Sequence, residues 1–97
     1  MPSLSEEAGH VRKRVFVSGR VQGVWFRESL REQAVALGVA GWVRNLMDGR
    51  VEALLEGPEP AVDRVVAWCH QGPSRAHVDG VEVRLETPIG ESGFHVR

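Results

Sequence analysis

"AGWVRNLMDGRVEALLEG", residues 40–57, contains the turn on which the fold of this chain depends. Apolar residues recur in residues 39–46 and again in residues 50–56, and each run has the length of a strand. Between them lies "MDGR", and an Asp-Gly pair flanked by two such runs is a strong short-range signal for a hairpin. We therefore expect an antiparallel hairpin in the middle of the chain.

On the N-terminal side of this hairpin the sequence predicts one strand and one helix. Residues 11–19, "VRKRVFVSG", alternate between two faces, which predicts a strand ending at Ser18-Gly19. Residues 26–38 have the helical period, and Gly38 is a natural end for the helix. The apolar stripe of this helix consists of Phe26, Leu30, Ala34 and Leu37.

The C-terminal side repeats the pattern with a helix and a strand. Residues 57–72 predict a helix with prolines 58 and 60 in its first turn and a buried stripe of Val62, Val65, Val66 and Cys69. Residues 77–88 predict a strand, and residues 92–97 a short fifth strand-like element. Right-handed crossovers then place both helices on one side of one sheet. We expect an α+β ferredoxin-like split βαββαβ two-layer sandwich, with a mostly antiparallel sheet and two helices on one face.

Composition limits the classes of protein to consider. The 97 residues carry a formal net charge of −1, which argues against general binding to nucleic acid or to anionic membranes. Cys69 is the only cysteine, so no internal disulfide forms, and we expect a cytoplasmic protein. Residues 1–10 are polar, resemble no signal peptide and are expected to be a disordered leader. Residues 11–97 are expected to form a single, monomeric domain.

The stretch "GRVQGVWFR", residues 19–27, is a candidate anion site because it leaves a strand and enters a helix. The first N–H groups of a helix lack partners and carry the positive end of its dipole. Gly19 and Gly23 permit the positive φ angles with which a loop can turn further N–H groups toward one anion. Arg27 is unfavourable in a first helical turn unless an anion lies beside it. On spacing alone, a plain strand-to-helix turn with a surface arginine is an equal alternative.

Asn45 is a polar amide near the end of an otherwise apolar strand. One interpretation is that Asn45 begins the turn that contains Asp48-Gly49, a common use of asparagine. The other is that Asn45 faces the anion loop, because in a split βαβ fold the second strand can lie close to the end of the first. There its amide would hold a water molecule in line with a bound phosphoryl group.

Together, "GRVQGVWFR" and "GWVRNLMDGRVE" resemble the two-part signature of the acylphosphatase family, and the similarity covers residues 11–97. The resemblance implies a free-standing enzyme with the ferredoxin-like fold that hydrolyses the carboxyl–phosphate bond of acyl phosphates. The products are a carboxylate and inorganic phosphate, and no metal or cofactor takes part. Arg27 falls on the substrate-binding arginine of the family and Asn45 on its water-positioning asparagine. The phosphate cradle falls on Gly19, Arg20, Val21, Gln22, Gly23, Val24 and Trp25.

Several residues are given no part in this chemistry. Neither motif contains an evident proton acceptor, so we expect a phosphate oxygen of the substrate to take the proton from water. We set Glu28 aside because neighbouring side chains on a helix diverge by about 100°. Trp25 borders the site, where rim and packing roles both stay open. We expect a solvated charge run at residues 12–14 and core positions for Trp42, Trp68 and Cys69. Four scattered histidines form no metal-ligand set: His10, His70, His77 and His95.

Two other functions are weighed against hydrolysis. One alternative is a non-catalytic ferredoxin-like module that binds RNA or anions. The RNA binders of this fold stack bases on aromatic residues of the sheet, but the aromatic-rich stretch of such proteins is absent here. The chain could also be the acylphosphatase-like domain of a larger carbamoyl-transferring protein. Because the sequence stops at Arg97, we expect a free-standing enzyme. Small acyl phosphates are the expected substrates.

Overall fold

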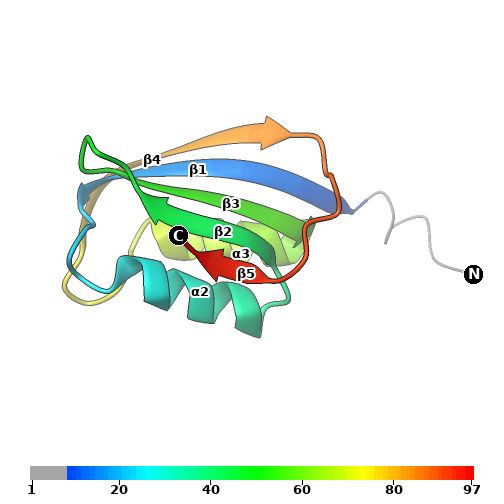
Figure 1. The fold of residues 1–97 in the computed structure, drawn as a ribbon, viewed down its shortest axis with the longest axis horizontal. Helices are drawn as coiled ribbons and strands as arrows, with labels where there is room; N and C mark the ends of the chain where they lie inside the picture. The colour runs from blue at the N-terminus through cyan, green and yellow to red at the C-terminus, as the bar shows by residue number, and fades with distance from the viewer. Residues whose placement is uncertain (1–8) are drawn as a thin grey trace, which may run out of the picture.

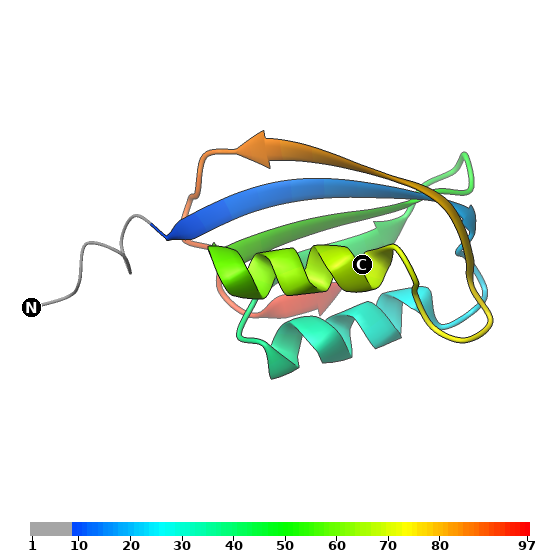
Figure 2. The same ribbon diagram turned by 180° about the vertical axis from the view of Figure 1, so that it is seen from behind.

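The computed structural model describes residues 9–97, which form one five-stranded sheet with two helices packed on one face (Figures 1 and 2). Strand β1 begins at His10, inside the expected leader; residues 1–8 lie outside the described residues. The elements in chain order are β1 (His10–Arg20), α2 (Phe26–Ala36), β2 (Ala40–Asn45), β3 (Val51–Pro58), α3 (Glu59–Cys69), β4 (His77–Glu86) and β5 (Phe94–Val96).

The sheet has the order β4-β1-β3-β2-β5, with β3 in the middle. The pairs β4–β1, β1–β3 and β3–β2 are antiparallel, and β5 adds in parallel to the outer edge of β2. The predicted hairpin is confirmed: Asn45 pairs with Val51, and the Leu46 N–H donates to the Arg50 carbonyl at 2.8 Å. This strand order, with two helices on one face of the sheet, is the predicted ferredoxin-like α+β fold.

The core lies between the helices and the sheet. Both predicted helical stripes are confirmed in their main positions, because the two helices bury Phe26, Leu30, Ala34, Val62, Val65 and Cys69. These side chains pack with the helix-facing residues of the strands, including Val15, Val17, Val43, Ala53 and Leu55. Each fully buried aliphatic or aromatic side chain contributes roughly 1.5–3 kcal/mol. Burial also raises the pKa of the Cys69 thiol to about 12, so this cysteine fills space and stays unreactive.

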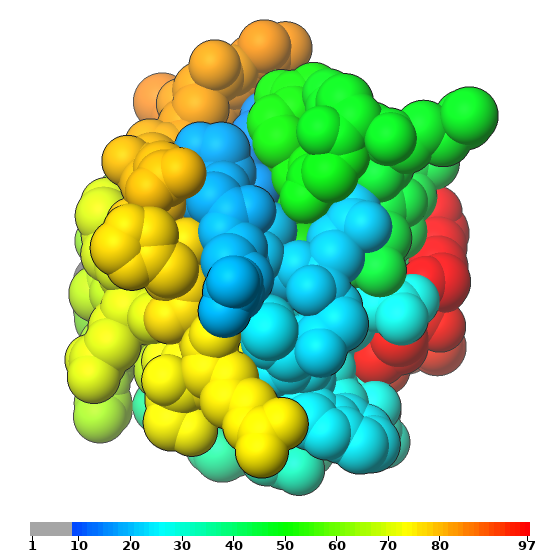
Figure 3. Space-filling view, turned by 90° about the vertical axis from the view of Figure 1, so that its left-hand side faces the viewer, coloured from blue at the N-terminus to red at the C-terminus, as the bar shows by residue number. Residues whose placement is uncertain are grey.

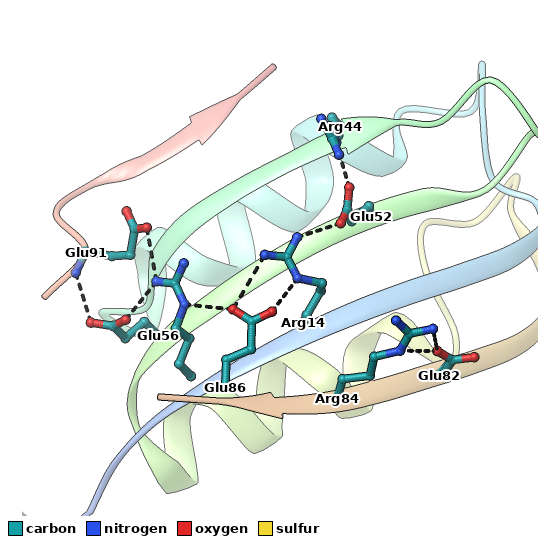
Figure 4. Close-up of polar contacts among 9 residues, drawn as sticks. Arg14, Arg44, Glu52, Glu56, Glu82, Arg84, Glu86 and Glu91 are labelled. Atoms are coloured by element: carbon teal, nitrogen blue, oxygen red, sulfur yellow. Dashed lines mark hydrogen bonds and ion pairs between the residues drawn. The ribbon is translucent and has the colours of Figure 1, made fainter. Parts of the chain in front are cut away.

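The opposite face of the sheet carries a network of arginines and glutamates (Figure 4). Arg12 is only 7% exposed, and its guanidinium pairs with Glu56 at 2.9 Å and with Glu86 and Glu91 at 3.1 Å. Arg14 pairs with Glu52 at 2.6 Å and also with Glu86. The expectation of a solvated charge run is therefore wrong for both arginines. The reason is register: strands β3 and β4 place carboxylates directly beside β1.

Trp42 is buried as predicted, but on the open face of the sheet rather than under the helices. Its ring is covered by the guanidinium groups of Arg14, Arg44 and Arg97, which lie 5.5, 5.2 and 4.5 Å from the ring centroid. Trp68 packs against the helix-side core and against Phe26, with ring centroids 5.3 Å apart. Because side chains alternate along β2, Trp42 and Arg44 point to the open face, and Val43 and Asn45 point to the helices.

One glycine sets how closely β2 approaches β3. Gly41 has φ 143°, and a Cβ atom at this position would lie 1.7 Å from the Leu54 carbonyl oxygen. Its N–H donates to the Gly93 carbonyl at 2.9 Å, so the same residue also fixes the chain that leads into β5. No side chain fits there without moving the backbone.

Candidate active site

A cavity of about 420 Å³ lies at the end of the molecule where β1 ends and α2 begins. At this end the loop after β1 meets the turn of the β2–β3 hairpin and the C-terminal strand (Figure 3). The cavity therefore draws its walls from segments far apart in the sequence. Its lining residues are Val21, Gly23, Trp25, Phe26, Arg27, Glu28, Asn45 and Val96.

The loop between β1 and α2 is shaped to leave N–H groups free. Gly23 has φ 74° and Trp25 has φ 65°, so the chain turns through the left-handed region twice just before the helix. The first bond of α2 runs from the Ser29 N–H to the Trp25 carbonyl at 3.0 Å, and no side chain caps the helix. Within residues 9–97, the main-chain N–H groups of residues 22–28 have no hydrogen-bond acceptor. An anion in the cavity could accept several of them.

The first two predicted cradle residues lie in strand β1 rather than in the loop. Gly19 has the predicted positive φ, 120°, but this conformation serves a register shift against β4, where a Cβ would lie 2.1 Å from the His77 carbonyl oxygen. Arg20 follows as the last residue of β1 and is exposed. Neither residue lines the cavity, and neither does Val24, which is buried in the core.

Gln22 also points away from the cavity, toward the hairpin. Its side-chain Nε2 donates to the main-chain oxygens of Leu46 at 2.7 Å and Arg50 at 2.9 Å. These two residues close the base of the turn after β2. The sequence places Gln22 in the predicted cradle but carries no local signal for this contact, because its partners lie 24 and 28 residues away.

Asn45 ends β2 and lines the same cavity as Arg27. Its side-chain Oδ1 is buried and has no hydrogen-bond partner among residues 9–97. The turn is held instead by Asp48, whose carboxylate accepts from the Arg50 N–H at 3.1 Å and from the Arg50 Nε at 2.8 Å. The Asn45 side chain thus lines the cavity, while the turn is held by Asp48. A buried amide oxygen without a partner is costly unless something enters to donate to it.

Arg27 is the second residue of α2, and its guanidinium lies at the cavity wall. Its Nη1 donates to the main-chain oxygen of Arg97 at 3.0 Å, and the Arg97 N–H donates in turn to the Val43 carbonyl at 2.8 Å. These contacts link the start of α2 to the end of the chain beyond β5. The side chain of Arg27 is therefore held near β2, on the side where Asn45 points.

Three lining residues are absent from the site that the sequence predicts: Phe26, Glu28 and Val96. Phe26 is the buried first residue of α2. Val96 reaches the cavity from β5, a strand whose parallel pairing with β2 depends on long-range register. Glu28 lines the cavity together with its helix neighbour Arg27. The divergence of neighbouring side chains on a helix is therefore not a sufficient reason to set Glu28 aside. Its carboxylate accepts a hydrogen bond from Arg31 at 3.1 Å on the outer surface of α2.

The described residues contain few other candidates for chemistry. In residues 9–97, no three His, Cys, Asp or Glu side chains gather where they could hold a metal ion. His77 pairs with Asp79 at 3.2 Å on the exposed surface of β4. No helix in this part of the chain is long and apolar enough to cross a membrane.

Fold and cavity together define a small α+β protein with a cavity of mixed polar and apolar lining between its first strand–helix loop and the end of its hairpin. A profile of the acylphosphatase family matches residues 13–96. The acylphosphatase of Rubrobacter xylanophilus is 63% identical over 87 residues, which are 89% of this chain and 79% of that protein. That of Haloarcula marismortui is 58% identical over 88 residues, covering 91% and 97% of the two chains.

The solved structures agree with these sequence relatives. An acylphosphatase from Coxiella burnetii superposes with a TM-score of 0.91 at 37% identity, over 98% of this chain and 100% of that one. The chain belongs to the acylphosphatase family, as the two motifs predicted. It is an enzyme, a hydrolase of acyl phosphates.

Proposed function

We propose that the cavity between the β1–α2 loop and Asn45 is the place where the acyl phosphate is hydrolysed. Arg27 and the N–H groups of residues 22–28 would hold the phosphoryl group, and Asn45 would orient the attacking water. The observation that carries this proposal is that Arg27 and Asn45 line one cavity while the Asn45 Oδ1 is buried without a partner among residues 9–97.

The chemistry requires charge stabilisation more than proton transfer to the leaving group. The water oxygen forms a bond to phosphorus on the side opposite the acyl oxygen. The phosphorus–oxygen bond to the acyl group then breaks, and the carboxylate leaves with its electron pair. A carboxylate is a weak base and needs no acid catalyst to depart. Fixed donors around the equatorial oxygens stabilise the transition state, and losing one such donor lowers kcat by roughly a hundredfold or more.

Asn45 is suited to the other requirement, the direction of attack. Its Oδ1 can accept a hydrogen bond from water, and its Nδ2 can donate to a phosphoryl oxygen. A side chain that holds a water in line contributes through orientation. The water proton passes to a phosphoryl oxygen of the substrate in this proposal. Glu28 is the competing acceptor because it lines the cavity, and its pairing with Arg31 directs it outward.

The test is benzoyl phosphate hydrolysis by wild type, Arg27→Ala and Asn45→Ala, with Glu32→Ala, at an exposed position of the same helix, as a control. We expect Arg27→Ala to weaken inhibition by inorganic phosphate and Asn45→Ala to lose turnover while keeping that inhibition. Turnover should be unchanged by EDTA, and Glu28→Gln should keep the pH profile of kcat. Wild-type kcat in Asn45→Ala, or loss of turnover in EDTA, would contradict the proposal.

The RNA-binding alternative fits the open face of the sheet poorly. Base stacking requires accessible rings, but guanidinium groups cover Trp42, and those of Arg50 and Arg84 both lie 4.9 Å from the Phe16 centroid. We also propose that the enzyme works as a monomer in the cytoplasm without a cofactor. Sedimentation at micromolar concentration tests the monomer.

A further inference from the structure

Strand β4 forms an open edge of the sheet. It pairs with β1 on one side, and no strand among residues 9–97 pairs with its other side. Its ten residues, His77–Glu86, include no proline and no lysine, two of the residues with which proteins keep edge strands from pairing with another chain. Its register against β1 is regular from Gly80 to Glu86. The backbone donors and acceptors along this edge can therefore accept a further strand.

The helix-side face of β4 exposes apolar side chains. Helix α3 packs on β1 and β3 and leaves β4 largely uncovered (Figure 2). Val81 and Val83 lie opposite the core residues Val17 and Val15, so they point to the same face of the sheet as the core. Val83 is 39% exposed, and Leu85, the next residue on this face, is 76% exposed. An added strand would extend this apolar row.

The open face of the same strand carries charges of both signs. Glu86 is held by Arg12 and Arg14 of the network described above. Glu82 and Arg84 lie further along the strand, are both exposed, and pair with each other at 2.6 Å. An exposed ion pair of this kind contributes little to stability, so its two members are free to exchange partners with a neighbouring strand.

A second copy of the same strand fits this edge in one register. If two copies of β4 pair antiparallel about a two-fold axis at Val83, Val81 of each copy lies opposite Leu85 of the other. On the open face the same register places Glu82 opposite Arg84, and the symmetry makes this contact twice. An axis at Glu82 or at Arg84 would instead place like charges directly opposite each other, which is destabilising.

We propose that two copies of the enzyme associate through their β4 edges, with the two-fold axis at Val83, and join their five-stranded sheets into one. The interface is small, and its charge pairs are exposed, so we expect a weak, submillimolar Kd. At micromolar concentration the enzyme stays the monomer proposed above. No residue of β4 lines the cavity, so each copy keeps its own cavity and pairing should leave kcat unchanged.

The experiment is sedimentation equilibrium from micromolar to millimolar concentration, where wild type should approach twice the monomer mass. Glu82→Arg and Arg84→Glu each place like charges opposite at both contacts and should weaken association by roughly tenfold. The double variant Glu82→Arg/Arg84→Glu regains opposite charges at both contacts and the wild-type net charge, so it should associate like wild type. Glu32→Arg, on the exposed surface of α2, changes the net charge as Glu82→Arg does and should also associate like wild type.

Mixing the two single variants gives an independent test. In a mixed pair every contact joins an arginine to a glutamate, so the mixture should associate although each variant alone does not. Wild type that stays monomeric at millimolar concentration, wild-type association of Glu82→Arg, or a monomeric double variant or mixture overturns the inference. Turnover measured at nanomolar enzyme, where all variants are monomers, should match wild type.

Discussion

The side-chain Nε2 of Gln22 lies 2.7 Å from the main-chain oxygen of Leu46, the residue that follows Asn45. The same nitrogen donates to the Arg50 carbonyl at 2.9 Å, across the base of the hairpin turn. One side chain therefore fastens the loop with the free N–H groups to the turn that ends β2. We expect the distance between the proposed phosphate site and the Asn45 amide to depend on this contact.

Replacing Gln22 by leucine should loosen this contact without touching the cavity. Two hydrogen bonds to main-chain oxygens are lost, which lowers the free energy of unfolding by roughly 1–3 kcal/mol. Because Asn45 is then held less well, kcat should fall roughly tenfold or more, with a smaller change in inhibition by phosphate. Urea unfolding and steady-state kinetics measure both effects. Gln71→Leu, at an exposed position, is the control, and indistinguishable kcat values for the two variants would rule out a positioning role.

Asn45→Asp should differ from Asn45→Ala in its effect on phosphate. Both changes remove the amide donor and should abolish most turnover. A carboxylate at this position also repels a bound phosphate, because like charges about 4 Å apart interact strongly in a partly buried site. We expect phosphate inhibition to weaken by at least roughly tenfold in Asn45→Asp and to be kept in Asn45→Ala. Isothermal titration with phosphate at pH 7 measures the difference; equal affinities would place Asn45 away from the anion.

Gly23→Ala should separate backbone strain from the function of the loop. Gly23 has φ 74°, and a Cβ at this position would meet no atom within 4 Å apart from those of Gly23 and its chain neighbours. Gly38, after α2, has φ 72° and equally open surroundings. Alanine should therefore destabilise the protein by about 1–2 kcal/mol at either position. Only Gly23→Ala places a methyl group beside the cavity, so only this variant should lose phosphate affinity. Equal activity in the two variants after matching for stability would contradict the cradle.

Acid should lower the free energy of unfolding because Glu56 becomes protonated. Burial alone would raise its pKa, but hydrogen bonds from the Ile89 N–H, the Arg12 guanidinium and the N–H groups of Glu91 and Gly90 outweigh burial and lower it from 4.5 to about 2. The folded state thus releases this proton more readily than the unfolded chain. The resulting stability, about 3 kcal/mol, is complete above pH 4.5 and is lost as the pH falls toward 2.

Urea unfolding across pH 2–7 measures this dependence. Glu56→Gln should flatten the curve between pH 4.5 and 2, and at pH 7 it should lower the free energy of unfolding by about 3 kcal/mol because Arg12 loses a buried partner. Glu32→Gln, on the exposed surface of α2, should leave both the slope and the neutral stability unchanged. A wild-type slope in Glu56→Gln would show that other carboxylates carry the acid dependence.

The features that could be predicted from the sequence are those that local chemistry determines. The hairpin followed from Asp48-Gly49, the helices from their apolar stripes, and the positive φ of Gly23 from its place before a helix. The burial of Arg12 could not be predicted, because its partners Glu56 and Glu86 lie 44 and 74 residues away and meet it only through strand register.

The residues of the candidate site also differ in whether local sequence or tertiary pairing places them there. For Arg27, position in a first helical turn leaves an anion site and a plain surface arginine as equal alternatives, and the cavity lining includes it. For Asn45 the sequence alone does not decide between turn and site, since the choice depends on which face of β2 its side chain occupies. Val96 and the contact of Gln22 with Leu46 depend on tertiary pairing that no short segment encodes.

The tight approach of β2 to β3 at Gly41 affects how random-mutagenesis screens of this enzyme are interpreted. Any side chain at position 41 collides with the Leu54 backbone. Position 41 lies in β2, four residues before Asn45. Such variants would score as inactive. If activity scores were plotted along the sequence, position 41 would then be mistaken for part of the active site, although it does not contact the substrate. Pairing each activity score with a measure of soluble yield would assign position 41 to folding.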